Sequence, residues 1–553
     1  MKYILQTAKT LWAFVFVTAL TSVNAQSIPA YWKGLKPGKY NVGFKSLCVF
    51  DTARNYDLSL GDSTSPLKNK KIGRPIVLNI WYPAAISNAP AMQLKDYFEF
   101  NGNEDTKTFL EALKKYQYEN SKMYAVEYNI DENSIVGDAA MLDKTSGTIF
   151  QQYISANTIA HKNAAPLKGD FPVVIYHEGL GGTFDENFLL HEYLASNGYI
   201  VIASAFQVND GSNYIDRAGN KLGWQVSTGD DDATFGDITF LINYCATNHI
   251  TKSKKVFLMG HSYGANSSIV YIGLGHENVN AIVPLDSDFG YETDFNFLEE
   301  NYTSTYYPFY KQRLAYYNGL PVFCVGRKEA LFGMVDSFSL SRRHYLTIAN
   351  MVHNDFTAQG AIGRFFCSPY IKDKAKYDSV HENYLHLCTA ILRFLNACSN
   401  GEKGLAQKDI SLYAGWKFKV YEPGRENPFN QQTQYYKKTK QWKEYANVIE
   451  QYIKENDVSA SWLNEYVWRM YETVDDAEVM KQAASWLAPY MNDNAPYYIM
   501  DTYSAALYKA GDFDKAKAWA EKAIAKGKKE NEDTRETENL LAKIISAKQH
   551  IQQ

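Results

Sequence analysis

Residues 256–264 are Val-Phe-Leu-Met-Gly-His-Ser-Tyr-Gly. The first four are an apolar run typical of a buried strand, and residues 265–272 can begin a helix. Between them lies Gly-x-Ser-x-Gly, a sharp strand-to-helix turn that lifts the serine hydroxyl out of a sheet and needs glycine where side chains would clash. The stretch predicts that Ser262 is a nucleophile that a histidine can reach.

The pattern around this turn alternates strands with helices. Two early strands are expected at residues 40–50 and 75–82. Further strands are expected at 172–176, 199–203, 281–285 and 322–325, with helices at 186–197 and 232–245. Such alternation predicts a mostly parallel sheet with helices on both faces. We therefore expect an α/β fold, and the Gly-x-Ser-x-Gly turn between a strand and a helix is typical of its α/β-hydrolase type.

Three regions are expected along the chain. Residues 1–25 have the charge and apolar pattern of a secretory signal cleaved near Ala25, so we expect export to the periplasm or the medium. Residues 26–422 form the hydrolase domain, and residues 90–168 are a helical insertion or lid within it. Residues 423–553 show helices only.

The last region resembles tetratricopeptide repeats. An offset of 33 residues aligns Ala516 with Ala483 and Trp519 with Trp486, close to the 34-residue repeat. Two such repeats are too few for independent stability, so this region is expected to pack on the hydrolase domain or on another chain. A groove that binds a protein partner and a cap that only stabilises both fit the pattern.

Composition excludes several function classes. The 553 residues have a net charge of −4, which gives no electrostatic reason to bind nucleic acid or an anionic membrane. No run after the N-terminal segment is long enough to span a bilayer. The six cysteines include no Cys-x-x-Cys pair, so neither a redox motif nor a zinc site is indicated, and no cofactor or metal is implied. Export would permit disulfides, whose pairing the sequence leaves open, and buried free thiols are the default interpretation.

A glycine-rich loop follows the strand at 172–176, with the sequence His177-Glu178-Gly179-Leu180-Gly181-Gly182. Ester hydrolysis passes through an oxyanion that backbone N–H groups can stabilise, and such a loop supplies them. We assign one donor to the amide of Leu180 and the other to that of Tyr263. Glu178 fits either a pocket residue or a solvated loop carboxylate, and we expect the latter.

The catalytic histidine should follow the serine, because the order in this fold is serine, acid, histidine. His353 comes after a strand-like segment, in the loop context that a triad histidine requires. The other candidates are less suitable, because they lie in strand-like, helical or terminal segments: His276, His344, His381, His386 and His550.

Spacing leaves the acid open. Asp286 ends the strand at 281–285, one strand earlier than the commonest position, whereas Glu329 and Asp336 follow the next strand.

Four motifs together resemble the platelet-activating-factor acetylhydrolase family, near the dienelactone-hydrolase-like enzymes. They are Glu-Gly-Leu-Gly at 178–181, Gly-His-Ser-Tyr-Gly at 260–264, Leu-Asp at 285–286 and Val-His-Asn-Asp-Phe at 352–356. The resemblance implies a triad of Ser262, Asp286 and His353. The chain departs from the family at Glu178, where the family has a histidine. The insertion at residues 90–168 and the segment at residues 290–319 are not expected from the family core and could build the substrate pocket, so the family's phospholipid substrate is not carried over.

The sequence therefore predicts an exported serine hydrolase that cleaves carboxylic esters through an acyl-enzyme and takes a small-molecule ester. A peptidase or an acyltransferase would use the same triad. A non-catalytic binding protein that uses the helical repeats is the alternative from another class.

Overall fold

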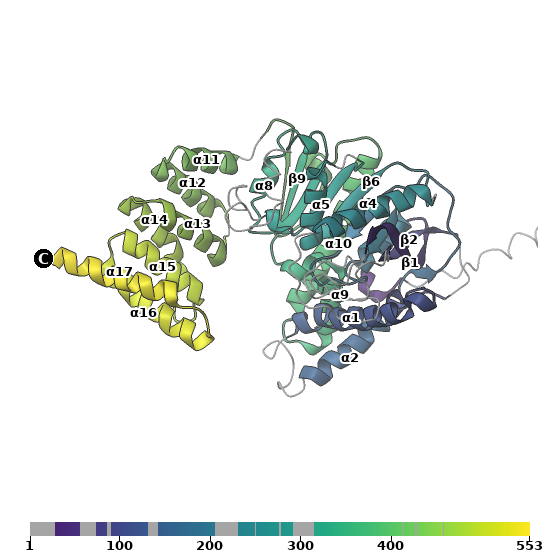
Figure 1. The fold of residues 1–553 in the computed structure, drawn as a ribbon, viewed down its shortest axis with the longest axis horizontal. Coiled ribbons are helices and arrows are strands. Elements are labelled where there is room, and N and C mark those ends of the chain that lie inside the picture. Colours follow the sequence, from purple (N-terminus) through teal and green to yellow (C-terminus); the bar gives the residue numbers. More distant parts are fainter. Residues whose placement is uncertain are drawn as a thin grey trace, which may run out of the picture. The chain divides into compact units, whose positions relative to one another are not determined.

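The structure is a computed structural model, and its described residues are 28–55, 73–85, 90–130, 142–204, 231–248, 250–275, 278–290, 314–411, 413–425, 428–456 and 458–552. The predicted signal segment lies outside them. The chain divides into two compact units, Met1–Phe257 with Asn354–Leu392, and Leu258–His353 with Arg393–Gln553. Figure 1 shows the helices and strands of both.

Five strands belong to the first unit, in the order β4-β5-β2-β1-β3. The two longest, β1 (Asn41–Asn55) and β2 (Gly73–Ala84), form an antiparallel pair, and β2 also runs antiparallel to β5 (Ile200–Ser204). β4 (Val173–His177) is parallel to β5 and wholly buried. The end of the predicted insertion supplies β3 (Ala160–Lys162), which pairs with β1.

The first unit also contains helices, the last of which, α10, ends in the second unit. Their bounds are α1 (Lys107–Ala125), α2 (Leu142–Ile154), α3 (Phe188–Ser196), α4 (Asp231–Thr247), α9 (Ala358–Cys367) and α10 (Lys374–Ser399). All nine residues of α3 are buried, which explains its mostly apolar sequence. A buried ion pair of 2.7 Å joins Arg74 of β2 to Asp237 of α4.

The remaining strands follow in the order β10-β9-β8-β7-β6 and belong to the second unit, apart from the first two residues of β6. Their bounds are β6 (Val256–His261), β7 (Ala281–Leu285), β8 (Val322–Arg327), β9 (Arg343–Ile348) and β10 (Trp416–Tyr421). β7, β8 and β9 are parallel, whereas β10 is antiparallel to β9. The helices that follow β6 and β8 are α5 (Tyr263–Gly273) and α8 (Gly333–Asp336). The expected mostly parallel α/β sheet is confirmed.

The C-terminal part of the second unit is helical, as expected. Its helices are α11 (Pro428–Lys438), α12 (Trp442–Glu455), α13 (Ala460–Thr473), α14 (Ala477–Leu487), α15 (Tyr497–Lys509), α16 (Phe513–Glu530) and α17 (Arg535–Gln552), drawn green to yellow in Figure 1. They share one apolar core, in which the aligned alanines Ala483 and Ala516 are fully buried. Their assignment to tetratricopeptide repeats stays a prediction.

A buried polar cluster ties α11 to the β8–β9 region. The carboxylate of Asp336 accepts hydrogen bonds from Tyr345 of β9 at 2.6 Å and from Asn430 of α11 at 2.8 Å. The Asn430 amide also donates to the carbonyl of Leu331 at 3.3 Å, and Leu331 is part of the helical core. The helices are thus attached by specific contacts close to the predicted boundary at residue 422.

These contacts predict that Asn430→Ala lowers the free energy of unfolding by about 1–3 kcal/mol, because it leaves part of a buried carboxylate without a donor. Urea denaturation followed by circular dichroism measures the change. Gln432→Ala, on an exposed position of the same helix, is the matched control and should change stability little. Equal effects of the two substitutions would contradict the role of Asn430.

For the described residues, no helix is both long and apolar enough to cross a membrane. All six cysteines are free thiols, as expected, and five of them are buried.

Candidate active site

Ser262 lies at the turn between β6 and α5. Its backbone has φ 53° and ψ −118°, a conformation that costs a non-glycine residue energy and is seldom adopted outside functional turns. The Ser262 amide donates to the carbonyl of Leu285 at 3.0 Å. This bond holds the serine turn against the end of β7. The candidate acid Asp286 is the next residue after that strand.

Asp286 is bonded to His353. The two side chains meet with 2.5 Å between Nδ1 of the histidine and Oδ2 of the carboxylate. The Asp286 side chain is fully buried, whereas that of His353 is 44% exposed. An ionised carboxylate can only accept, so Nδ1 of His353 is the donor in this bond, and in a neutral imidazole Nε2 would then be the acceptor.

Arg327, at the end of β8, fixes the carboxylate of Asp286. Its backbone amide donates to Oδ1 at 3.2 Å, and its Nε lies 3.1 Å from Oδ2. Asp286 itself has a positive φ of 47°, and its amide donates to the carbonyl of Val325 at 2.8 Å. These contacts from β8 hold a strained residue in one conformation.

The other two candidate acids are placed differently. Asp336 is occupied by the cluster around Tyr345 and Asn430 described above. Glu329 lies half-buried in the turn after β8. Of the three candidate acids, Asp286 is the one for which the structure shows a bond to His353.

A second histidine, which the sequence analysis did not single out, contacts His353. His261, buried at the end of β6, donates from Nε2 to the backbone carbonyl of His353 at 2.9 Å. The two imidazole rings lie 4.6 Å apart between centroids. His261 directly precedes Ser262, so this contact ties the serine turn to the histidine backbone. The only sequence signal was its place within the Gly-x-Ser-x-Gly motif.

Two of the other histidines in the described residues have roles in the core. His344 lies between the carbonyls of Val322 and Leu405, at 2.9 and 3.0 Å, and burial lowers its pKa to about 4. His381 donates to the carbonyl of Tyr31 at 2.6 Å, and burial again lowers its pKa to about 4. Both therefore stay neutral at neutral pH.

The predicted oxyanion loop forms a tight turn after β4. The amide of Gly182 donates to the carbonyl of Gly179 at 2.9 Å, and Gly181 has a φ of 69° that suits glycine. In this part of the structure, the amides of Leu180 and Gly181 donate to no described group. Tyr263 begins α5, where helix N–H groups are not used within the helix. The pairing of the Leu180 and Tyr263 amides as oxyanion donors stays a prediction.

Glu178 differs from the expectation of a solvated carboxylate. Its residue is only 3% exposed, and neither carboxylate oxygen has a hydrogen-bond partner among the described residues. The glycine loop folds over it so closely that a Cβ on Gly182 would lie 2.6 Å from the Glu178 Cβ. Burial, reinforced by the nearby Glu186 carboxylate, raises the pKa of Glu178 well above its ordinary value.

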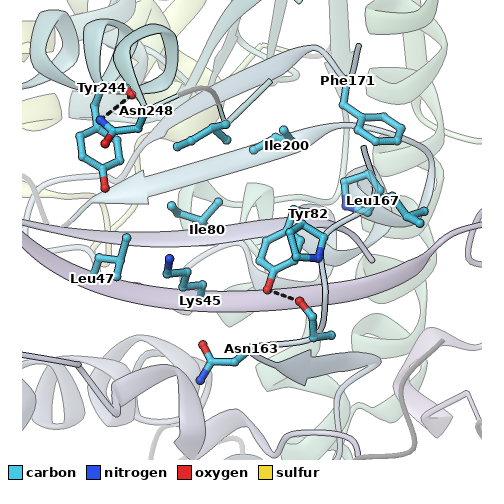
Figure 2. A pocket seen from close by; sticks show the side chains of 14 residues that line it. Lys45, Leu47, Ile80, Tyr82, Asn163, Leu167, Phe171, Ile200, Tyr244 and Asn248 are labelled. Carbon is cyan, nitrogen blue, oxygen red and sulfur yellow. Dashed lines mark hydrogen bonds between the residues drawn. The ribbon is translucent and has the colours of Figure 1, made fainter. Parts of the chain in front are cut away.

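A cavity of about 530 Å³ lies elsewhere in the first unit, against one face of β1, β2 and β5 (Figure 2). Its walls include Lys45, Leu47, Ile80, Tyr82 and Ile200. None of the predicted catalytic or oxyanion residues lines it. In the part of the chain that the structure describes, no group of three or more His, Cys, Asp or Glu side chains could hold a metal ion.

Comparison with known proteins supports the fold and the type of chemistry. The model of the dienelactone hydrolase family matches residues 156–292, a range that includes the glycine loop, Ser262 and Asp286. This match supports a dienelactone-hydrolase-like α/β-hydrolase that acts on esters. No curated protein matches the chain.

Several solved structures are similar to it. A ferulic acid esterase from Streptomyces cinnamoneus is 16% identical, with a TM-score of 0.41, over 69% of this chain and 98% of that one. A puromycin-hydrolyzing peptidase of Mycobacterium tuberculosis is also 16% identical, with a TM-score of 0.28, over 43% and 36%. A variant of the monoglyceride lipase of Saccharomyces cerevisiae is 12% identical, with a TM-score of 0.26, over 40% and 88%.

The burial of Glu178 predicts a pH effect on stability. The pKa of Glu178 is raised in the folded protein, so the folded state holds this proton more tightly than the unfolded state does. The resulting contribution to the free energy of unfolding is fully present below the unfolded pKa, and it is lost as the pH rises through the folded pKa. The glutamine in Glu178→Gln stays neutral at every pH. The free energy of unfolding of this variant should therefore fall less between about pH 5 and about pH 8 than that of the wild type. Urea denaturation at both pH values measures this.

Glu119→Gln is the control for this experiment, since Glu119 is an exposed acid on α1. It should keep the pH dependence of the wild type. An identical pH dependence for Glu178→Gln would mean that Glu178 ionises in the folded protein as it does in water.

Proposed function

We propose that this chain is a serine hydrolase that cleaves carboxylic esters, with Ser262 as the nucleophile. The observation that carries the proposal is the 2.5 Å bond between His353 and the buried Asp286, beside a serine held in a strained strand-to-helix turn. In serine hydrolases, an acid binds one ring nitrogen of a histidine, and the other ring nitrogen acts as the base that activates the serine hydroxyl.

The reaction would proceed in two halves. His353 Nε2 removes the proton from Ser262 Oγ as the oxygen attacks the ester carbonyl, and the amides of Leu180 and Tyr263 stabilise the resulting oxyanion. The tetrahedral intermediate collapses, and the leaving alkoxide takes the proton back from the imidazolium. Water, deprotonated by the same histidine, then attacks the acyl-serine ester. The second tetrahedral intermediate collapses to the carboxylic acid, and Ser262 Oγ takes the proton from the imidazolium as it leaves.

Asp286 would remain ionised through this cycle. Its carboxylate stabilises the imidazolium that forms in both halves of the reaction. Arg327 contributes a positive charge 3.1 Å from Oδ2, which favours the ionised form of the acid. His261 keeps the histidine backbone in register with the serine turn through the bond to the His353 carbonyl.

The predicted export and the predicted repeat domain belong to the same proposal. A signal segment at residues 1–25 would place the hydrolase in the periplasm or the medium, where it would meet small ester substrates. The helices after residue 423 would either stabilise the hydrolase or offer a surface to a protein partner.

Ser262→Ala tests the nucleophile. The variant should fold normally and lose at least about 10⁴-fold in kcat on short p-nitrophenyl esters, because the remaining groups have no hydroxyl to activate. Initial rates and thermal unfolding are measured together. Near-wild-type activity in a folded variant would overturn the proposed function.

Asp286→Asn tests the acid. An amide at this position cannot fix the same histidine tautomer or stabilise the imidazolium, and the expected loss in kcat is about 10⁴-fold. Glu329→Gln is the matched control, since it makes the same carboxylate-to-amide change one strand later and should leave kcat unchanged. If Glu329→Gln loses the activity and Asp286→Asn keeps it, the assignment of the acid is wrong.

A further inference from the structure

One face of α1 carries polar side chains that reach the glycine loop. Gln117, Asn120 and Tyr124 follow each other at spacings of three and four residues, so they project from the same side of the helix. The Asn120 amide donates to the carbonyl of Gly181 at 2.7 Å, and the Tyr124 hydroxyl donates to the carbonyl of Leu180 at 2.9 Å.

The third residue extends the same pattern. Gln117 lies with its amide nitrogen 3.5 Å from the carbonyl of Gly182, and its oxygen accepts from the amide of Phe184 at 2.9 Å. Three successive carbonyls of the loop, at residues 180–182, therefore face side chains of one helix. Asn120 and Tyr124 make the two short bonds, so they carry most of this interaction.

These bonds determine where the loop amides point. In a trans peptide the N–H is directed opposite to the C=O of the same plane. Since the Leu180 carbonyl faces Tyr124, the Gly181 N–H points away from α1. The Gly179 carbonyl accepts from the Gly182 amide, which turns the Leu180 N–H away from that turn bond. Both amides, which have no acceptor among the described residues, are thus kept in a fixed direction.

The other end of the loop is held by a carboxylate. Glu186 accepts from the Gly179 amide at 3.0 Å through one oxygen and from the Tyr176 hydroxyl at 2.6 Å through the other. The first amide of the loop is thereby occupied, and the two that follow are not. This division leaves Leu180 and Gly181 as the donors that a substrate oxygen could use.

α1 is itself fixed in place. Asn120 also donates to the Tyr116 hydroxyl at 2.6 Å, and Ser121 donates to the buried Asp185 at 2.7 Å. The backbone of α9 approaches α1 so closely that a Cβ on Gly363 would lie 2.0 Å from the carbonyl oxygen of Ala125. These contacts hold α1 against Asp185 and α9, so the helix supports the loop.

Tyr124 also contacts the segment that follows His353. Its backbone carbonyl accepts from the Asn354 side chain at 2.9 Å, while its hydroxyl holds Leu180. Tyr124 thus links the glycine loop to Asn354, the residue that follows His353 in the sequence.

We propose that Asn120 and Tyr124 are positioning residues that preorganise the amides of Leu180 and Gly181 as oxyanion donors. The inference rests on the proposed function and deepens it, since it assigns the predicted insertion a part in transition-state stabilisation and adds the Gly181 amide as a donor. Donors fixed before the reaction stabilise the developing charge without reorganising, and small misplacements weaken this effect.

The test compares Tyr124→Phe and Asn120→Ala with the wild type on p-nitrophenyl acetate. Each should lower kcat about tenfold with KM within about twofold, because the donors act on the tetrahedral state and not on ground-state binding. Each should weaken a boronic acid inhibitor, whose serine adduct is tetrahedral and anionic, by a similar factor. The affinity for acetate, a planar product, should change little.

Matched controls separate positioning from general damage. Tyr128→Phe removes the hydroxyl of an exposed tyrosine whose ring lies 5.3 Å from that of Tyr124, and Glu119→Ala shortens the exposed side chain beside Asn120. Both should keep wild-type kcat and boronic acid affinity. Thermal unfolding of every variant shows whether the fold is retained.

The outcomes are distinct. Folded Tyr124→Phe and Asn120→Ala variants with wild-type kcat and inhibitor affinity would overturn the positioning role while Ser262-dependent hydrolysis stands. Equal weakening of acetate and boronic acid would also overturn it, because it indicates a damaged pocket. A wild-type protein without Ser262-dependent hydrolysis would overturn the proposed function, and this inference with it.

Discussion

The hydrogen bond between the buried Asp286 carboxylate and Nδ1 of His353 is the interaction on which the account of this protein depends. The bond requires a proton on Nδ1, so Nε2 is the atom that the proposed function assigns as the base. The bond exists because parallel strands end at one edge of a sheet: Asp286 follows β7, and Arg327, which holds the carboxylate, ends β8. Catalytic groups in open α/β sheets are expected at that edge.

Strained turns at strand ends are the second constraint. Ser262 and Asp286 both have positive φ angles at the ends of neighbouring strands, at a cost of about 1–3 kcal/mol each. Bonds from other strands stabilise them: the Leu285 carbonyl accepts from Ser262, and the Val325 carbonyl accepts from Asp286. In the first unit, the turn after β4 is supported from outside by the side chains of α1.

The sequence alone predicts strands and turns that are set by neighbouring residues. The strand at 281–285 was placed at its observed bounds, and the serine turn has the strained backbone that Gly-x-Ser-x-Gly implies. Features set by distant contacts could not be predicted. Spacing left the acid open among three residues, because only the fold shows which carboxylate reaches His353. Glu178 looked like a loop residue, but the glycine turn buries it, and Asn120 meets Gly181 across 61 positions.

The most direct test of the central claim is covalent labelling with a fluorophosphonate, followed by peptide mapping by mass spectrometry. The reagent reacts with a serine whose hydroxyl is activated by a histidine base. We expect a single adduct on Ser262 in the wild type and a greatly reduced labelling rate in Asp286→Asn and His353→Ala. An adduct on another serine, or labelling of Ser262 that is unaffected by both substitutions, would contradict the assignment of Asp286 and His353 as the groups that activate it.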